Sequence, residues 1–151
     1  MSTAVAIKPN LTKPSLTLKR RLNAPPARVY QAWTDPQKMM RWYAPADAET
    51  LAAETEARVG GRFRVLMRTV DGQEHDVSGV YREVVRDEKL VFTWQWRSKP
   101  EWESLVTVTF KGDGDATILT LNHEQLPDDA ERDGHRTGWS GALDKLAHVV
   151  A

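Results

Sequence analysis

The sequence predicts a single α+β domain in which a curved antiparallel sheet wraps around a long C-terminal helix and encloses a ligand pocket. Three observations support this prediction. The chain has 151 residues, a length that suits one domain with one core. Over most of residues 50–124, apolar and polar residues alternate, as in a meander of strands with one buried face. An apolar stripe at helical spacing then runs through residues 128–150.

Composition and charge argue against several classes of function. Lys plus Arg and Asp plus Glu number 21 each, so the formal net charge is zero and we expect no nucleic-acid partner. The chain has no cysteine, which excludes disulfides, thiol catalysis and thiolate metal sites. We find neither a secretory signal nor a run approaching the ~20 apolar residues of a membrane span. The expectation is therefore a cytoplasmic protein without stable membrane association.

The N-terminal part of the chain is predicted to contain an arm and one strand. Residues 1–14 mix prolines and lysines with small residues, which predicts a flexible arm, and the folded domain is expected to occupy residues 15–151. Residues 16–22 are predicted to form the first strand. If this strand lies at an exposed edge of the sheet, it can support a homodimer.

Two short helices are predicted after the first strand. Asn23 is placed to cap a helix that begins at the prolines that follow it. Pro36 restarts the chain, and residues 39–43 are expected on a second short helix that Pro45 ends.

The alternating region predicts a series of strands joined by short turns. Asp71-Gly72 is a strong hairpin signal, because glycine accepts the positive φ of such turns. On the strand that follows, Gly79, Tyr81 and Val85 are predicted to share one face. The strands are expected at about 62–68, 76–85, 90–96, 105–110 and 117–123.

The C-terminal helix is predicted to begin after Asp128, with Glu131 completing a capping-box pattern. Its buried stripe consists of Trp139, Ala142, Leu143, Leu146 and Val150. Three glycines interrupt this helix at about 1 kcal/mol each relative to alanine: Gly134, Gly138 and Gly141. Two interpretations are open for them, namely close packing against a loop or strand, and room left for a ligand or a bend.

Aromatic and polar residues on the inward faces indicate a pocket, although plain core packing is the alternative. Pockets combine apolar walls with a few polar groups, and a buried histidine needs a hydrogen-bond partner. The predicted lining is Trp42, Tyr43, Phe63, Met67, Tyr81, Trp94, Trp96, Val108, His123, His135, Trp139 and Leu143.

Catalysis has only weak candidates in this sequence, His123, His135 and Tyr81. His123 and Glu124 are adjacent on a strand and point to opposite faces, so they cannot form a dyad. The two histidines can meet across the interior, which a polar pocket lining explains equally well. There is no His-x-x-x-His pattern and no close carboxylate cluster, so neither a metal site nor a cofactor is expected.

Several strings, in their order and spacing, carry a family resemblance that covers almost everything after residue 14. They are Ala24–Pro36, Arg41–Pro45, Gly60–Arg64, Gly79–Val84, His123–Pro127 and Arg132–Trp139. The chain resembles the heat-shock protein 90 ATPase activator homologue (AHSA-type) family of the START-like SRPBCC superfamily. One minor departure is Ala44, where relatives often have glycine before the proline.

The resemblance implies a helix-grip, Bet v 1-like fold with a deep hydrophobic cavity, and functions that range from binding lipids, hormones and polyketides to aromatic cyclisation. It also implies a link to the stress response and a chaperone partner. The full co-chaperone has a further N-terminal domain, for which residues 1–14 offer only a short arm.

Three hypotheses follow for function. The first is a binding module for a small apolar or aromatic molecule. The second is a cyclase- or hydratase-like enzyme in which His123 or His135 acts as acid–base and Tyr81 orients the substrate. The third is an interaction protein that resembles the chaperone ATPase activator.

Overall fold

The computed structural model describes residues 13–151, and the predicted flexible arm falls almost wholly outside them. One antiparallel sheet has the strand order β1-β7-β6-β5-β4-β3-β2. Its strands are β1 (Leu16–Leu22), β2 (Ala48–Thr55), β3 (Arg62–Thr69), β4 (Glu74–Val85), β5 (Lys89–Trp96), β6 (Glu103–Asp113) and β7 (Ala116–Glu124). The helices of the described residues are α2 (Pro26–Thr34), α3 (Pro36–Met39) and α4 (Asp129–Val150).

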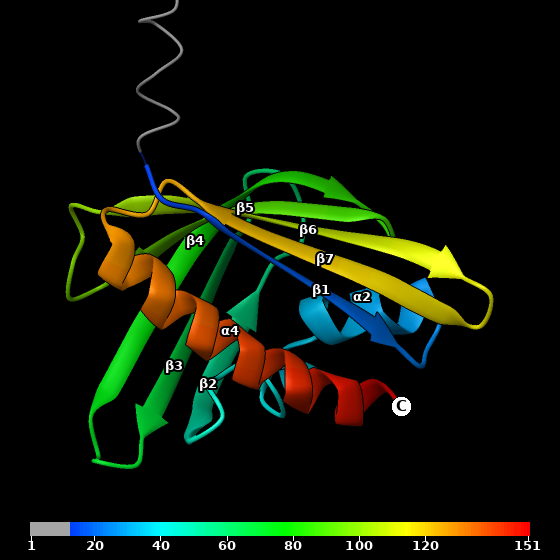
Figure 1. Cartoon of the computed structure of the whole chain (residues 1–151), viewed down its shortest axis with the longest axis horizontal. Coiled ribbons are helices and arrows are strands. Elements are labelled where there is room, and N and C mark those ends of the chain that lie inside the picture. The colour runs from blue at the N-terminus through cyan, green and yellow to red at the C-terminus, as the bar shows by residue number, and fades with distance from the viewer. Residues whose placement is uncertain (1–12) are drawn as a thin grey trace, which may run out of the picture.

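The sheet curves around α4, which crosses its inner face (Figure 1). The helix starts beside the β4 and β5 end of the sheet and finishes near α2, where Arg28 Nη1 donates to the Val150 carbonyl oxygen at 3.4 Å. The predicted α+β, helix-grip architecture is therefore confirmed.

Strand β1 has the predicted bounds and lies at one edge of the sheet, where it pairs with β7 through a register that sets Leu18 opposite Leu121. The other edge strand, β2, was not predicted. Its sequence has no apolar–polar alternation, and a bulge between Thr50 and Ala52 shifts its register with β3. Pattern-based prediction fails at such a strand, because a bulge changes which residues share a face.

A second bulge corrects the prediction for the end of β4. The pairing of β4 with β5 shifts between Tyr81 and Glu83, so two residues on β4 oppose one on β5. Tyr81 is buried as predicted, whereas Val85 is exposed instead of sharing its face. Gly79 is needed on the same strand, because a Cβ there would overlap the carbonyl oxygen of Thr93 on β5.

The two short helices differ from prediction at their ends. Pro25, and not Asn23, occupies the N-cap position of α2, and no side chain caps this helix. Helix α3 ends at Met39, where residues up to 43 had been expected to be helical. Tight backbone turns follow, in which the N–H of Tyr43 donates to the Met39 carbonyl at 3.0 Å. These turns bring Trp42 and Tyr43 into the interior from a loop.

The start and the buried face of α4 agree with prediction. The Asp128 carboxylate accepts from the Glu131 N–H at 2.8 Å, which satisfies one free donor of the first turn. The expected reciprocal bond is absent among the described residues, because the Glu131 side chain pairs with Lys99 instead. The predicted stripe is buried, and each of its fully enclosed leucines, Leu143 and Leu146, contributes about 1.5–3 kcal/mol relative to exposure.

Candidate functional site

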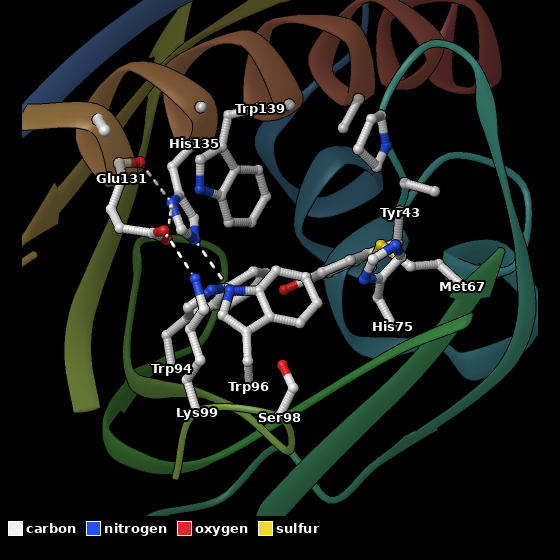
Figure 2. Close-up of a pocket in the computed structure, with 16 residues that line it drawn as sticks. Tyr43, Met67, His75, Trp94, Trp96, Ser98, Lys99, Glu131, His135 and Trp139 are labelled. Carbon is white, nitrogen blue, oxygen red and sulfur yellow. Dashed lines mark hydrogen bonds and ion pairs between the residues drawn. The ribbon is translucent and has the colours of Figure 1, made fainter. Parts of the chain in front are cut away.

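A cavity of about 350 Å³ lies between the first half of α4 and strands β3 to β5 (Figure 2). Trp94 and Trp96 reach it from β5, Trp139 and His135 from α4, and Tyr43 from the loop after α3. The remaining lining residues are Ala44, Pro45, Met67, His75, Ser98, Lys99, Ala130, Glu131, Gly134, Gly138 and Ala142.

Two outer depressions are larger, at about 670 and 760 Å³, and lie on the charged face around Arg64 and Asp76 and beside α2. Their walls contain many charged and polar side chains, and Arg64 and Asp76 are ion-paired with each other at 2.8 Å. Small-molecule sites are usually apolar clefts with few polar groups, so the inner cavity is the candidate site.

The walls of the cavity are aromatic. Ring centroids of Trp94 and Trp139 lie 5.0 Å apart, and the Trp96 ring stands perpendicular to Trp94 at 5.5 Å. Tyr43 is nearly parallel to Trp94, with an interplanar angle of 18° and a centroid distance of 6.4 Å. Aromatic rings in these arrangements attract one another, and this attraction adds to the stabilisation from their buried area. They therefore form a stiff wall.

His123 lies behind this wall on β7 and is completely buried. Its Nδ1 accepts from the indole N–H of Trp139 at 3.1 Å, which fixes the ring proton on Nε2. Nε2 therefore donates to Ser104 Oγ at 2.7 Å, and the Ser104 hydroxyl donates to the Trp94 carbonyl at 3.3 Å. Both ring nitrogens are satisfied by the protein itself.

His135 lines the cavity on α4 and is held in the opposite tautomer. Its Nε2 accepts from the indole N–H of Trp96 at 3.0 Å, and its Nδ1–H donates to the Glu131 carbonyl at 2.7 Å (Figure 2). The ring centroids of His135 and His123 are 5.0 Å apart, so the predicted meeting of the two histidines across the interior occurs.

Both histidines are held in the neutral form. Burial lowers the pKa of His123 well below 6.5, and the neighbouring His135 lowers it further. Burial also lowers the pKa of His135. Protonation of either ring would turn its accepting nitrogen into a donor that faces a tryptophan N–H. Neither ring offers a free lone pair, so acid–base chemistry would first require a Trp–His hydrogen bond to break.

Charged groups stand at the polar side of the cavity. Lys99, from the loop after β5, donates to the Glu131 carboxylate at 2.9 Å (Figure 2). This ion pair ties the β5–β6 loop to the start of α4. In it, Lys99 and Glu131 neutralise each other's charge. His75 on β4 also lies at the cavity, where its ring approaches that of Trp96 edge-on with the centroids 6.2 Å apart.

The opposite rim is the loop from Pro45 to Ala48, which is fastened to α4. Lys145 Nζ donates to the carbonyl oxygens of Pro45 and Ala48 at 2.7 and 2.8 Å. A Cβ at Gly141 would lie 2.5 Å from the Ala46 backbone nitrogen, so this glycine allows close packing of helix and loop. A Cβ at Gly134 would meet nothing within 4 Å. Of the two interpretations offered for the helical glycines, close packing thus applies to Gly141, whereas Gly134 borders open space.

The structure divides the predicted lining into two groups. Tyr43, Met67, Trp94, Trp96, His135 and Trp139 line the cavity. The others lie in the packed core or behind the wall: Trp42, Phe63, Tyr81, Val108, His123 and Leu143. The inward face of the sheet is longer than the cavity, so side chains towards α2 fill the interior.

Two core residues illustrate this division. The Trp42 indole N–H donates to the Ala32 carbonyl of α2 at 2.9 Å, and its ring packs on Trp33 at 4.6 Å. The Tyr81 hydroxyl lies 2.6 Å from Thr55 Oγ1, and burial raises the pKa of Tyr81 to about 12. Tyr81 is thus engaged outside the cavity, away from the substrate-orienting position proposed for it.

Several lining residues are not among those predicted from the sequence. Three of them lie in loops, namely Ser98, Lys99 and Pro45. The course of a loop cannot be predicted from the spacing of apolar residues. His75 could have been found, because it faces the same side of β4 as Val77 and Gly79 by simple alternation.

From residue 13 onward, no three His, Cys, Asp or Glu side chains converge as metal ligands would. Within the same residues, no helix has the length and apolarity needed to cross a bilayer.

A curved antiparallel sheet that grips a C-terminal helix over an apolar cavity defines a helix-grip protein of the START-like class. Residues 23–151 match the family described as Activator of Hsp90 ATPase homolog 1-like protein, and the chain belongs to this family. The human Activator of 90 kDa heat shock protein ATPase homolog 1 is 30% identical over 125 residues. That match covers 82% of this chain but only 33% of the human protein's length.

Solved structures agree with this assignment. A crystal structure of a Chromobacterium violaceum protein has a TM-score of 0.82 and 30% identity, covering 91% of this chain and 97% of that one. The AHSA1 protein from Silicibacter pomeroyi has a TM-score of 0.79 and 28% identity, covering 89% and 96% of the two chains.

Proposed function

We propose that this chain is a binding module for a small apolar or aromatic molecule held between the sheet and α4. The observation that carries the proposal is the aromatic cavity of about 350 Å³, which the protein's own side chains leave unfilled. Its volume exceeds the roughly 300 Å³ at the lower end for ligand pockets. Trp94, Trp139 and Tyr43 supply apolar faces for a flat molecule.

The state of the histidines supports binding over acid–base catalysis. His123 is behind the wall, and both nitrogens of His135 are committed to hydrogen bonds within the protein. A pocket whose histidines are already satisfied favours retention of an apolar guest, because the guest displaces water without leaving the ring nitrogens unpaired.

Titration with the neutral fluorescent probe N-phenyl-1-naphthylamine tests this proposal. The wild type should bind one probe molecule per chain with a saturable rise in emission. Ala142→Phe adds a ring where Ala142 lines the cavity, and it should weaken binding by about tenfold or more. Ala27→Phe is the matched control, because Ala27 is exposed on α2 away from the cavity. Unsaturable binding, or equal affinity of Ala142→Phe and the wild type, would rule out the cavity as the site.

A chaperone-related interaction is a second candidate, favoured by family membership and the match to the human activator. It calls for a direct assay, in which the chain is added to a purified Hsp90-type chaperone and ATP hydrolysis is measured. Stimulation that saturates with added chain would support this role. Unchanged hydrolysis, together with no complex in size-exclusion chromatography, would remove it.

A further inference from the structure

The Tyr43 hydroxyl is a polar group with unused hydrogen-bonding capacity inside the cavity. The side chain is only 3% exposed and lines the cavity. No residue in the described part of the chain hydrogen-bonds to its hydroxyl, and burial raises the pKa of Tyr43 well above 10. The hydroxyl therefore stays protonated and keeps a donor for a guest molecule.

The indole groups of the wall and the His135 ring have no comparable capacity, and the His75 ring is only half-buried. The N–H groups of Trp96 and Trp139 are bound to His135 and His123. The Trp94 N–H has no partner among the described residues, but it is enclosed by packing and has no accessible surface. Tyr43 is thus the wall residue whose polar atom is both buried and available.

The surroundings of Tyr43 define what it can meet. Figure 2 shows Tyr43 projecting from the Met67 side of the cavity towards Trp94 and Trp96. Its ring is nearly parallel to that of Trp94 and meets Trp139 edge-on at 5.8 Å. A flat molecule in the cavity that packs against these rings would bring a group at its edge to the hydroxyl.

Building on the proposed function, we propose that Tyr43 is the polar anchor of the pocket. Its partner is a flat, uncharged aromatic molecule with a carbonyl or similar hydrogen-bond acceptor at its buried end. The molecule is uncharged because an ion in this apolar interior would need a partner of opposite sign. The nearest charges, Lys99 and Glu131, are 2.9 Å apart and neutralise each other. A neutral acceptor meets the hydroxyl without that requirement.

Fluorenone and fluorene, which share a rigid three-ring shape and differ in one carbonyl, test this anchor. Their dissociation constants are measured by quenching of tryptophan fluorescence in the wild type, Tyr43→Phe and Tyr81→Phe. The quantity of interest is the fluorene-to-fluorenone ratio of dissociation constants, compared between proteins, because the difference in hydrophobicity between the two compounds is the same in each protein. Tyr81→Phe is the matched control, since its hydroxyl pairs with Thr55 outside the cavity.

We expect Tyr43→Phe to lower this ratio roughly fivefold to tenfold, as the loss of one neutral hydrogen bond predicts, while Tyr81→Phe leaves it unchanged. The carbonyl stretching band of fluorenone bound to the wild type should lie at lower wavenumber than that of fluorenone in an apolar solvent. This infrared shift in the wild type reports the hydrogen bond even if a variant folds poorly.

The two proposals fail in different ways. Saturable binding of both compounds with the same ratio in wild type and Tyr43→Phe, or no infrared shift in the wild type, would overturn the anchor and leave the binding function standing. No saturable binding of either compound or of the naphthylamine probe to the wild type would overturn both.

Discussion

Mild acid should destabilise this protein because two histidines are held neutral inside it. In the unfolded chain both take up a proton near pH 6.5, whereas burial lowers the pKa of His123 and His135 in the folded state. The free energy of unfolding is therefore greatest above about pH 6.5 and decreases as the pH falls towards the folded-state pKa values. The limiting slope is about 1.4 kcal/mol per pH unit for each histidine that stays neutral in the native state.

His123, whose pKa is the more strongly lowered, should alone account for up to about 1.6 kcal/mol between pH 6.5 and 5.0. His135 adds to this, with an upper bound of about 3 kcal/mol for the pair. Such a loss is a large part of the 5–15 kcal/mol that stabilises a typical domain. The assay is urea unfolding followed by tryptophan fluorescence, repeated at half-unit steps from pH 7.5 to 5.0.

His123→Gln separates the contribution of this residue. Glutamine cannot titrate, yet its amide can still accept from Trp139 and donate to Ser104. We expect lower stability at pH 7.5 but a slope reduced by up to about 1.4 kcal/mol per unit below pH 6.5. His148→Gln, which removes an exposed histidine, should keep the wild-type profile. A wild-type free energy that stays flat from pH 6.5 to 5.0, or an unchanged slope in His123→Gln, would refute the buried-histidine argument.

Further predictions concern the contacts of α4. Gly141→Ala places a Cβ 2.5 Å from the Ala46 nitrogen and should destabilise the fold by about 1–3 kcal/mol in urea unfolding, whereas Gly134→Ala, with nothing within 4 Å, should stabilise it by about 0.5–1 kcal/mol. Equal effects of the two substitutions would contradict the packing described for Gly141. Lys145→Met leaves two carbonyl groups of the loop at 45–48 without their donor and should reduce stability by about 1–2 kcal/mol. Amide hydrogen exchange in this loop should also become faster, and unchanged exchange would show that Lys145 does not hold it.

Local patterns were sufficient to predict most of the fold. The spacing from Trp139 to Val150 identified the buried face of α4, and the Asp128 cap placed its start at the right residue. Alternation on β6 and β7 identified inward residues, including His123. These predictions succeeded because the periodicity of a helix or a strand involves residues that are close together in the sequence.

The site was predicted only in part, because a cavity forms where the side chains of several elements leave space between them. The pattern of a single element does not show where that happens. Trp42 and Tyr43 are adjacent aromatic residues of similar appearance in the sequence, yet Trp42 packs on α2 while Tyr43 lines the cavity. The turn after Met39 sets the directions of these two side chains, and the periodicity of the sequence does not predict the course of a turn. The tautomers of His123 and His135 likewise depend on two tryptophans that lie far from them in the sequence.

The place of β1 in the sheet has a consequence for how the protein is made. Every other neighbouring pair of strands is consecutive along the chain, but β1 pairs with β7, and Asn122 bonds to Thr17 across 105 residues. Contacts over such separations form slowly, because a long loop must close first. During synthesis β1 leaves the ribosome first, yet its partner emerges among the last strands. The sheet can therefore be completed only after β7 has left the ribosome, and β7 keeps an unpaired edge until β1 joins it.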